Sequence, residues 1–208
     1  MRFILFVEGY TEKESMAPFL KRYLDEKLSV KVGIKTVRFD GWHEMVKDMP
    51  KKTRMYLEGP DRNDIIAVIG LLDLYGPTFY PNNITTTDER LNWAKECLEK
   101  NVGQNRFKMF FAVHEVEAWL LSQTEVFPKE VGQELVSESK RPEEVNFDDP
   151  PSKRLERIYL QKTGRKYKKR VYGSQLFSNL VPEIAANKCP ELKKMLEWML
   201  EMAKKAVV

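Results

Sequence analysis

Cysteine is scarce in this chain, and none of its hydrophobic runs is long. The two cysteines, Cys97 and Cys189, lie far apart and match no metal-ligand spacing. Isolated cysteines are typical of a reducing compartment, where a free cysteine behaves as a small hydrophobic residue. No segment approaches the roughly 20 apolar residues of a membrane span, and the apolar run 3–7 is too short for a signal peptide. We therefore expect a soluble, cytoplasmic protein with no membrane partner.

Composition excludes a mainly disordered protein. Hydrophobic residues make up 42% of the 208 residues, and four residues are tryptophan, which supplies enough apolar surface for a core. A chain of this length can fold as one domain or as a domain with a subdomain. The net charge of +4 is too small to identify a partner.

The first half of the chain alternates between strand-like and helix-like segments. Apolar runs without polar alternation predict strands that are buried on both faces, at 3–7, 65–72 and 107–113. The segment 34–39, which is rich in β-branched residues, predicts a further strand. Helical spacing of apolar residues predicts helices at about 11–27, 42–57 and 88–100. Thr11 and Glu14 predict a capping box that opens the first helix. This order predicts an α/β fold with a mainly parallel four-stranded sheet flanked by helices.

The second half changes character, because it contains helical patterns and no convincing strand. Helices are expected at 115–122, 128–139, 151–162, 174–186 and 190–205, with loops at 141–151 and 164–173. We therefore expect an α/β domain at 1–140 and a basic, helical C-terminal subdomain at 141–208 that packs on the first.

Carboxylates follow three of the predicted strands. Glu8 follows the first, Asp73 follows the third, and Glu115 and Glu117 follow the fourth. Because ligands of open α/β sheets bind beyond the carboxyl ends of the strands, we expect these acids to form one cluster. Clustered carboxylates repel one another unless a cation or a shared proton offsets their charge. Mg²⁺, which prefers oxygen ligands, is the expected cation.

Structural explanations exist for each of these acids. Glu8 can be a turn residue neutralised by the positive end of the next helix, and Asp73 can bind N–H groups of its own turn. If a helix has begun at Glu115, only one of Glu115 and Glu117 can point at a given site. Glu12 is explained by the first turn of a helix better than by function.

The chain resembles the Toprim domain of topoisomerases, primases and overcoming-lysogenization-defect (OLD) nucleases. More specifically, it is similar to an uncharacterised prokaryotic Toprim-like family that is regarded as a family of nucleases. The stretches that carry the resemblance are Val7-Glu8-Gly9-x-Thr11-Glu12, Asp73-Leu74-Tyr75-Gly76, Glu115-x-Glu117-Ala118-Trp119-Leu120, Pro151-Ser152-Lys153-Arg154-Leu155 and Cys189-Pro190-x-Leu192.

The resemblance implies a Toprim/Rossmann-like fold and roles for two of the acids. It places Glu8 at the position of the general acid/base and Asp73 at that of the first metal-binding aspartate. Toprim domains usually carry Asp-x-Asp, whereas Tyr75 stands at the second acidic position here. A phenol is neutral near pH 7 and is not a routine Mg²⁺ ligand, so Glu115 or Glu117 would have to replace that carboxylate.

A basic segment lies in the second half. Residues 153–170 contain nine lysines and arginines and one glutamate, and tyrosines are interleaved with them. Such a segment suits a nucleic-acid backbone, with tyrosines available for stacking, although a charge run is often only a solvated surface. The residues expected to bind nucleic acid are Lys153, Arg154, Lys168 and Lys169.

These observations favour a nuclease that depends on Mg²⁺ or Mn²⁺ and hydrolyses phosphodiester bonds of DNA or RNA. Glu8, Asp73 and Glu117 are the expected catalytic residues, and the same three with Glu115 are the expected metal ligands. The alternative is a non-catalytic Toprim-like module that binds nucleic acid or a partner ATPase encoded nearby, in a phage-defence or toxin–antitoxin-like system. A phosphatase or receiver-like acidic site on the same sheet is a weaker third reading.

Overall fold

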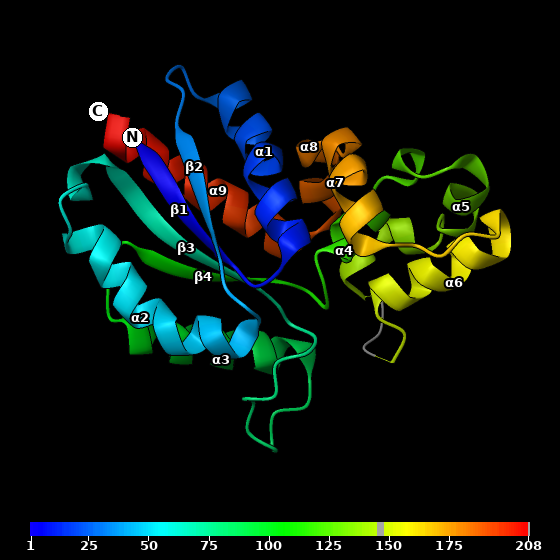
Figure 1. Cartoon of the computed structure of the whole chain (residues 1–208), viewed down its shortest axis with the longest axis horizontal. Coiled ribbons are helices and arrows are strands. Elements are labelled where there is room, and N and C mark those ends of the chain that lie inside the picture. The colour runs from blue at the N-terminus through cyan, green and yellow to red at the C-terminus, as the bar shows by residue number, and fades with distance from the viewer. Residues whose placement is uncertain (145–147, 208) are drawn as a thin grey trace.

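The computed structural model describes residues 1–144 and 148–207 and contains one four-stranded sheet in those residues (Figure 1). All neighbouring strands are parallel, in the order β2-β1-β3-β4. The strands are β1 (Arg2–Val7), β2 (Gly33–Arg38), β3 (Ile65–Asp73) and β4 (Phe107–Ala112). The predicted α/β fold with a parallel four-stranded sheet flanked by helices is therefore confirmed.

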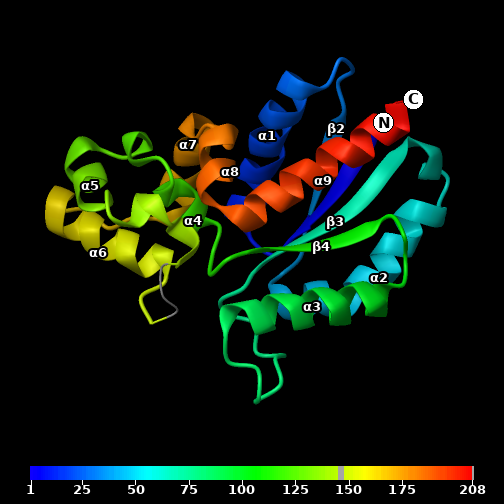
Figure 2. The same cartoon turned by 180° about the vertical axis from the view of Figure 1, so that it is seen from behind.

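Helices cover both faces of this sheet (Figures 1 and 2). On one face lie α1 (Tyr10–Lys27) and α9 (Pro190–Val207), and on the other lie α2 (Trp42–Glu58) and α3 (Thr87–Val102). Alternate residues of β1 enter two separate hydrophobic clusters, with Phe3, Leu5 and Val7 in one and Ile4 and Phe6 in the other. Because side chains alternate across a strand, covering both faces requires the uninterrupted apolar runs that the sequence shows.

The path of the chain places the topological crevice of an open parallel sheet, the point beyond the strand ends where the strand order reverses, between β1 and β3. From β1 the chain moves outward to β2, returns to β3 on the other side of β1, and continues to β4. The direction of travel thus reverses between β1 and β3. In open parallel sheets the carboxyl ends of strands at such a reversal form the usual ligand site.

In the described residues between β4 and α9, five α-helices lie beside the carboxyl ends of the strands (Figure 1). They are α4 (Glu117–Leu121), α5 (Lys129–Glu134), α6 (Pro151–Thr163), α7 (Lys169–Asn179) and α8 (Pro182–Lys188). Short 3-10 helices span Arg62–Asp64, Thr124–Val126, Glu138–Lys140 and Pro142–Glu144. The last helix, α9, returns to pack on β3 and β4. The division into domains at residue 140 stays a prediction.

Several predicted helix boundaries in the second half are wrong. The expected helix 174–186 is two helices, α7 and α8, and α7 begins at Lys169 inside the expected loop 164–173. Extended backbone at Leu180 and Val181 separates the two, and Pro182 is suited to the first turn of α8. The expected helix 128–139 shortens to α5 and a 3-10 turn. Residues 145–147 of the expected loop 141–151 lie outside the described residues.

The predicted capping box at Thr11 is also wrong. Gly9 is the N-cap of α1 without a side-chain hydrogen bond, and Thr11 is buried inside the helix. A complete capping box forms instead at α3, where Thr86 and Glu89 exchange their hydrogen bonds.

Within the described part of the chain, none of the helices combines the length and apolar character needed to cross a membrane.

Candidate active site

The ends of β1 and β3 bring Glu8 and Asp73 together. Glu8 directly follows β1, and Asp73 is the last residue of β3. The Asp73 backbone N–H donates to Glu8 Oε1 at 3.4 Å, and Asp73 Oδ1 accepts a hydrogen bond from the Val116 N–H at 3.0 Å. Both carboxylates therefore lie in the crevice where the direction of the sheet reverses.

A tight turn after β4 delivers Glu117 to the same crevice. His114 adopts a left-handed conformation with φ of 66°, which is rare for a residue with a side chain. Its carbonyl accepts a hydrogen bond from the Tyr75 N–H at 2.8 Å, which ties the turn to the end of β3. The turn leads into α4, whose first residue, Glu117, is fully buried. Burial also lowers the pKa of His114 to about 4, so its imidazole is neutral.

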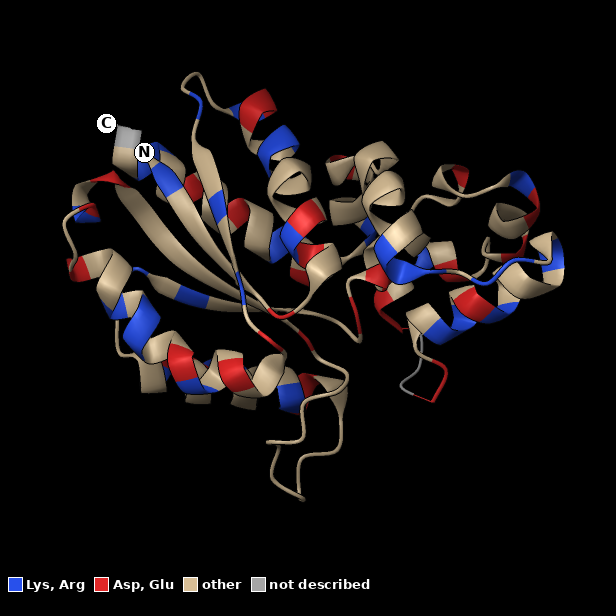
Figure 3. Ribbon diagram, viewed as in Figure 1, with Lys and Arg blue, Asp and Glu red and all other residues tan. Residues whose placement is uncertain are grey.

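Lys169 lies at the centre of the acidic cluster. Its Nζ is 3.0 Å from Glu117 Oε2, 3.2 Å from Glu12 Oε1 and 3.7 Å from Asp73 Oδ2. Lys169 is the first residue of α7, and Figure 3 shows this basic helix start beside the acidic residues that follow the strands. Three acids from distant parts of the chain, Glu12, Asp73 and Glu117, thus gather around one ammonium group, and Glu8 lies next to Asp73.

Burial favours the neutral form of the carboxyl groups in the cluster. Burial raises the pKa of Asp73 well above its ordinary value and that of Glu117 to about 7, although Lys169 opposes both shifts. Burial likewise raises the pKa of Glu8, against the hydrogen bond from the Asp73 N–H. Burial lowers the pKa of Lys169, but Glu117, Asp73 and Glu12 outweigh this and raise it well above its ordinary value.

The cluster offers oxygen donors of the kind that a hard divalent cation prefers. Three carboxylates contact one ammonium, with Glu8 beside them, and Glu117 Oε1 accepts no hydrogen bond from the described residues. Carboxylate oxygens are the ligands that Mg²⁺ and Mn²⁺ prefer. Their present spacing is closed around Lys169, and the described residues contain no group of three or more His, Cys, Asp or Glu already arranged as metal ligands.

Glu115 faces a different partner. Its Oε2 accepts a hydrogen bond from the Ser152 N–H at 2.8 Å, and its Oε1 accepts one from the Ser152 hydroxyl at 3.0 Å. Ser152 lies in the first turn of α6, where backbone N–H groups lack partners within the helix. Glu115 therefore caps α6. Its hydrogen bonds join the sequence motif around Glu117 to the motif around Ser152.

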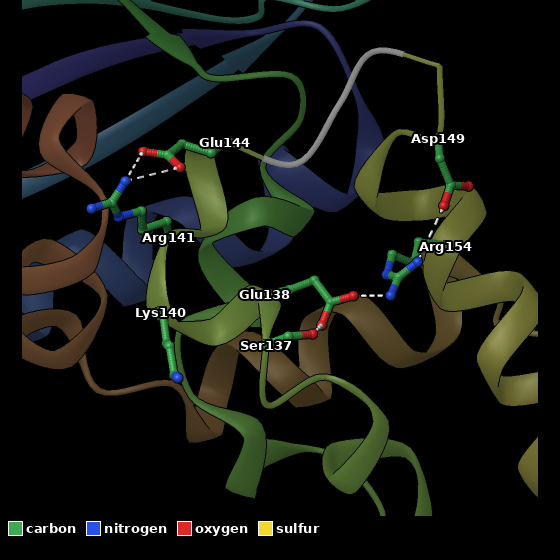
Figure 4. A pocket seen from close by; sticks show the side chains of 7 residues that line it. All are labelled: Ser137, Glu138, Lys140, Arg141, Glu144, Asp149 and Arg154. Carbon is green, nitrogen blue, oxygen red and sulfur yellow. Dashed lines mark hydrogen bonds and ion pairs between the residues drawn. The ribbon is translucent and has the colours of Figure 1, made fainter.

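The four residues expected to bind nucleic acid divide into two pairs. Lys153 and Lys168 are exposed and make no ion pair with the described residues. Lys169 is held by the acidic cluster. Arg154 pairs with Glu138 and with Asp149, at the wall of a surface cavity of about 520 Å³ (Figure 4).

The expected stacking tyrosines are not available to bases. Tyr159 and Tyr167 are 4% and 3% exposed, with ring centroids 5.3 Å apart, and both rings pack against Tyr172. The aromatic residues of the loop that follows β3 are also packed internally. Phe79 contacts Trp42 and Trp93, so this loop is pinned to α2 and α3.

Two residues of the cluster were assigned other roles by sequence reasoning. The sequence explains Glu12 by the start of a helix, yet this residue is 4% exposed and contacts Lys169. The spacing of Glu12 indicates its burial, because Glu12 precedes the buried Met16 and Phe19 by four and seven residues. It therefore lies on the same apolar face of α1. Lys169 was expected to contact phosphates, and no local pattern distinguished it from its basic neighbours.

Comparisons with known proteins find similar solved structures and a matching family model. The C-terminal region of the Burkholderia pseudomallei OLD protein is 18% identical, with a TM-score of 0.49, and the match covers 99% of this chain and 98% of that one. The C-terminal region of the Xanthomonas campestris pv. campestris OLD protein is 16% identical, with a TM-score of 0.47 and the same coverage. Scores this low are no guide to activity. No curated protein matches. A family model described as "Domain of unknown function (DUF4276)" matches residues 7–200, and the chain therefore belongs to the DUF4276 family.

Proposed function

We propose that this chain is a divalent-metal-dependent nuclease that hydrolyses phosphodiester bonds in DNA or RNA. The observation that supports the proposal is that Glu12, Asp73 and Glu117 meet around Lys169, with Glu8 beside Asp73, at the ends of β1 and β3. Buried carboxylates with raised pKa values are typical of functional sites. The Toprim-like motifs around Glu8 and Asp73 support the same reading.

The residues of the cluster would have different roles in the reaction. Asp73, Glu117 and Glu12 would hold Mg²⁺ or Mn²⁺ through their carboxylate oxygens. The bound ion would polarise the phosphoryl group and lower the pKa of a water molecule. Glu8, whose pKa is raised by burial, holds a proton more readily than an ordinary glutamate, which suits a general acid/base. Lys169 keeps the carboxylates together and neutralises part of their charge.

The nucleic acid would approach from the side on which α6 and α7 begin. Lys153, which follows the Ser152 that binds Glu115, and Lys168, which precedes Lys169, are exposed cations at the starts of α6 and α7. Cations in such positions bind phosphates and release counterions, which makes binding sensitive to salt. Glu115 is given the structural role of holding α6, and therefore Lys153, in place.

Cleavage of plasmid and single-stranded substrates with Mg²⁺ or Mn²⁺ tests the proposal. Asp73→Asn, Glu8→Gln and Glu12→Gln should each lower the rate by about 100-fold or more, because each removes a group that holds charge or a proton at the reacting centre. Glu130→Gln, a matched change at an exposed position of α5, should leave the rate unchanged. Activity that survives both Asp73→Asn and Glu8→Gln would reject this active site.

A second candidate, a non-catalytic module that binds nucleic acid or a partner ATPase, has one supporting observation. The cluster already contains its own cation, Lys169, and Tyr75 replaces the second acid of the usual Toprim pair. Calorimetry with Mn²⁺ separates the two candidates. Metal binding that is lost in Asp73→Asn favours the nuclease, and absence of binding at millimolar concentration favours the module.

A further inference from the structure

Two arginines meet over one exposed tyrosine at the rim of the acidic cluster. The guanidinium carbon of Arg38 lies 4.1 Å from the centroid of the Tyr10 ring, and that of Arg170 lies 4.7 Å from it. Tyr10 is 47% exposed. The three residues come from the end of β2, the start of α1 and the first turn of α7, so this Arg38–Tyr10–Arg170 stack is formed only in the folded chain.

The stack lies directly beside the cluster. Tyr10 is two residues after Glu8, and Arg170 follows Lys169. Arg38 is paired with Val7 in the sheet, and the backbone that follows it donates from the Gly41 N–H to the Glu8 carbonyl at 3.4 Å. The backbone segments that carry the two guanidinium groups therefore adjoin those that carry Glu8 and Lys169.

A purely structural role explains the stack poorly. A cation over an exposed aromatic ring contributes about 0.5–1 kcal/mol, and two like charges on one ring repel each other. The helix α7 is already fixed to α1, because Arg22 donates to the carbonyls of Phe177 and Leu180 at 2.8 and 2.7 Å, and Gly173 packs closely on Thr11. The additional cations thus have little to add as an anchor.

The charges of the two arginines are unequally balanced. Arg38 pairs with Asp40 and donates to the Phe39 carbonyl at 3.2 Å. Arg170 is exposed and has no ion pair among the residues that the structure describes. A guanidinium that is stacked on a ring loses little further freedom when it binds, and its planar set of N–H donors matches a phosphate. The stack is thus a prepared site for an anion at the edge of the crevice.

We propose that Arg38 and Arg170, held over Tyr10, bind a phosphate next to the one that lies in the acidic cluster, so that the ligand is a nucleic-acid strand and not an isolated phosphodiester. This inference rests on the proposed function for the position of the neighbouring phosphate. Arg170 and Lys169 are neighbours in α7. A phosphate bound by Arg170 would therefore also fix the position of Lys169 relative to the nucleic-acid strand.

Fluorescence anisotropy with a labelled oligothymidylate of about 20 nucleotides tests this site. The measurement is made in EDTA, so that binding is observed without cleavage, and an oligouridylate is measured in parallel. Arg170→Ala should weaken binding about 5- to 10-fold and reduce the salt slope by roughly 0.7, the value for one phosphate contact with a single strand. Tyr10→Leu should weaken binding, whereas Tyr10→Phe, which keeps the ring, should not.

Arg54→Ala is the matched control, because it removes an exposed arginine from α2, near the opposite ends of the strands. Absence of binding to either oligonucleotide, or equal affinities of Arg170→Ala and Arg54→Ala, would overturn the inference. If Arg38→Ala does not fold, the binding affinities of Arg170→Ala and Tyr10→Leu are sufficient to test the site. A protein that binds through the stack but cuts no substrate would reject the nuclease proposal alone.

Discussion

Lys169 is the residue on which the charge balance of the acidic cluster depends. It is the one cation that contacts Glu12, Asp73 and Glu117 among the described residues, and its side chain is 35% exposed. Removing one partner of a buried ion pair leaves an uncompensated charge, which is more costly than removing both partners. The carboxylates can take up protons in response, and this limits the cost.

We expect Lys169→Met to lower the free energy of unfolding by roughly 1–3 kcal/mol in EDTA, less than for a fully buried pair because the lysine is partly exposed. Thermal and urea unfolding measure the change. Lys168→Met alters the exposed neighbouring lysine, which contacts none of these acids, and should change stability by less than about 0.5 kcal/mol. Equal stability of the two variants would show that the cluster does not need its ammonium.

At the scale of elements, the N-terminus of α9 is capped by an acid from another segment. Glu143 Oε2 accepts a hydrogen bond from the Glu191 N–H at 3.1 Å. Burial raises the pKa of Glu143 to about 7, helped by the nearby Glu191 carboxylate, while the N–H groups of Glu191 and Leu192 and the charge of Lys194 oppose the shift. Cys189, whose own pKa is raised by burial, also lies close. The cap therefore titrates near neutral pH.

This shift predicts a pH dependence of stability. The folded-state pKa of Glu143, about 7, lies above its ordinary value of 4.5, so the folded protein binds the proton more tightly than the unfolded chain does. The stabilising contribution is complete below pH 4.5 and is lost as the pH rises through about 7. The free energy of unfolding of wild type relative to Glu143→Gln should fall by roughly 1–3 kcal/mol across this window.

Urea unfolding of both proteins between pH 4.5 and pH 8 measures the difference. The comparison with Glu143→Gln is essential, because Glu8, Asp73 and Glu117 also have raised pKa values and give wild type and variant the same trend. A difference that stays constant over the whole range would contradict the raised pKa of Glu143.

At the scale of the whole molecule, the position of Lys169 depends on how closely α7 approaches α1. A Cβ added to Gly173 would lie 2.7 Å from Thr11 Cγ2, and both residues are buried. Glycine at this position therefore allows the two helices to touch. The contact joins the helical half of the chain to the first helix of the sheet half, four residues along α7 from Lys169.

Gly173→Ala should destabilise the protein by roughly 1–3 kcal/mol, because overpacking forces α7 away from α1. Thr11→Ser removes the methyl group that the new Cβ would meet, so the double variant Thr11→Ser/Gly173→Ala should recover a substantial part of that loss. Unfolding of the two single variants and the double variant forms a mutant cycle that measures the coupling. Additive effects would show that the interface adjusts without strain.

Some features of the protein were determined by its sequence alone. Uninterrupted apolar runs and helical spacing report local burial, so the four strands and the helices between them could be predicted, as could the position of Glu8 and Asp73 at strand ends. The helix boundaries of the second half were less predictable, because α7 has a weak amphipathic pattern and begins within a basic segment.

Tertiary structure decided which charges meet. Glu12 and Lys169 lie far apart along the chain and come into contact only when Gly173 of α7 packs on α1. Glu115 and Ser152 pair in the same way, between the end of β4 and the start of α6. Ion pairs between distant segments leave no periodic signal in a sequence, since their energy depends on distance and burial that only the folded chain sets.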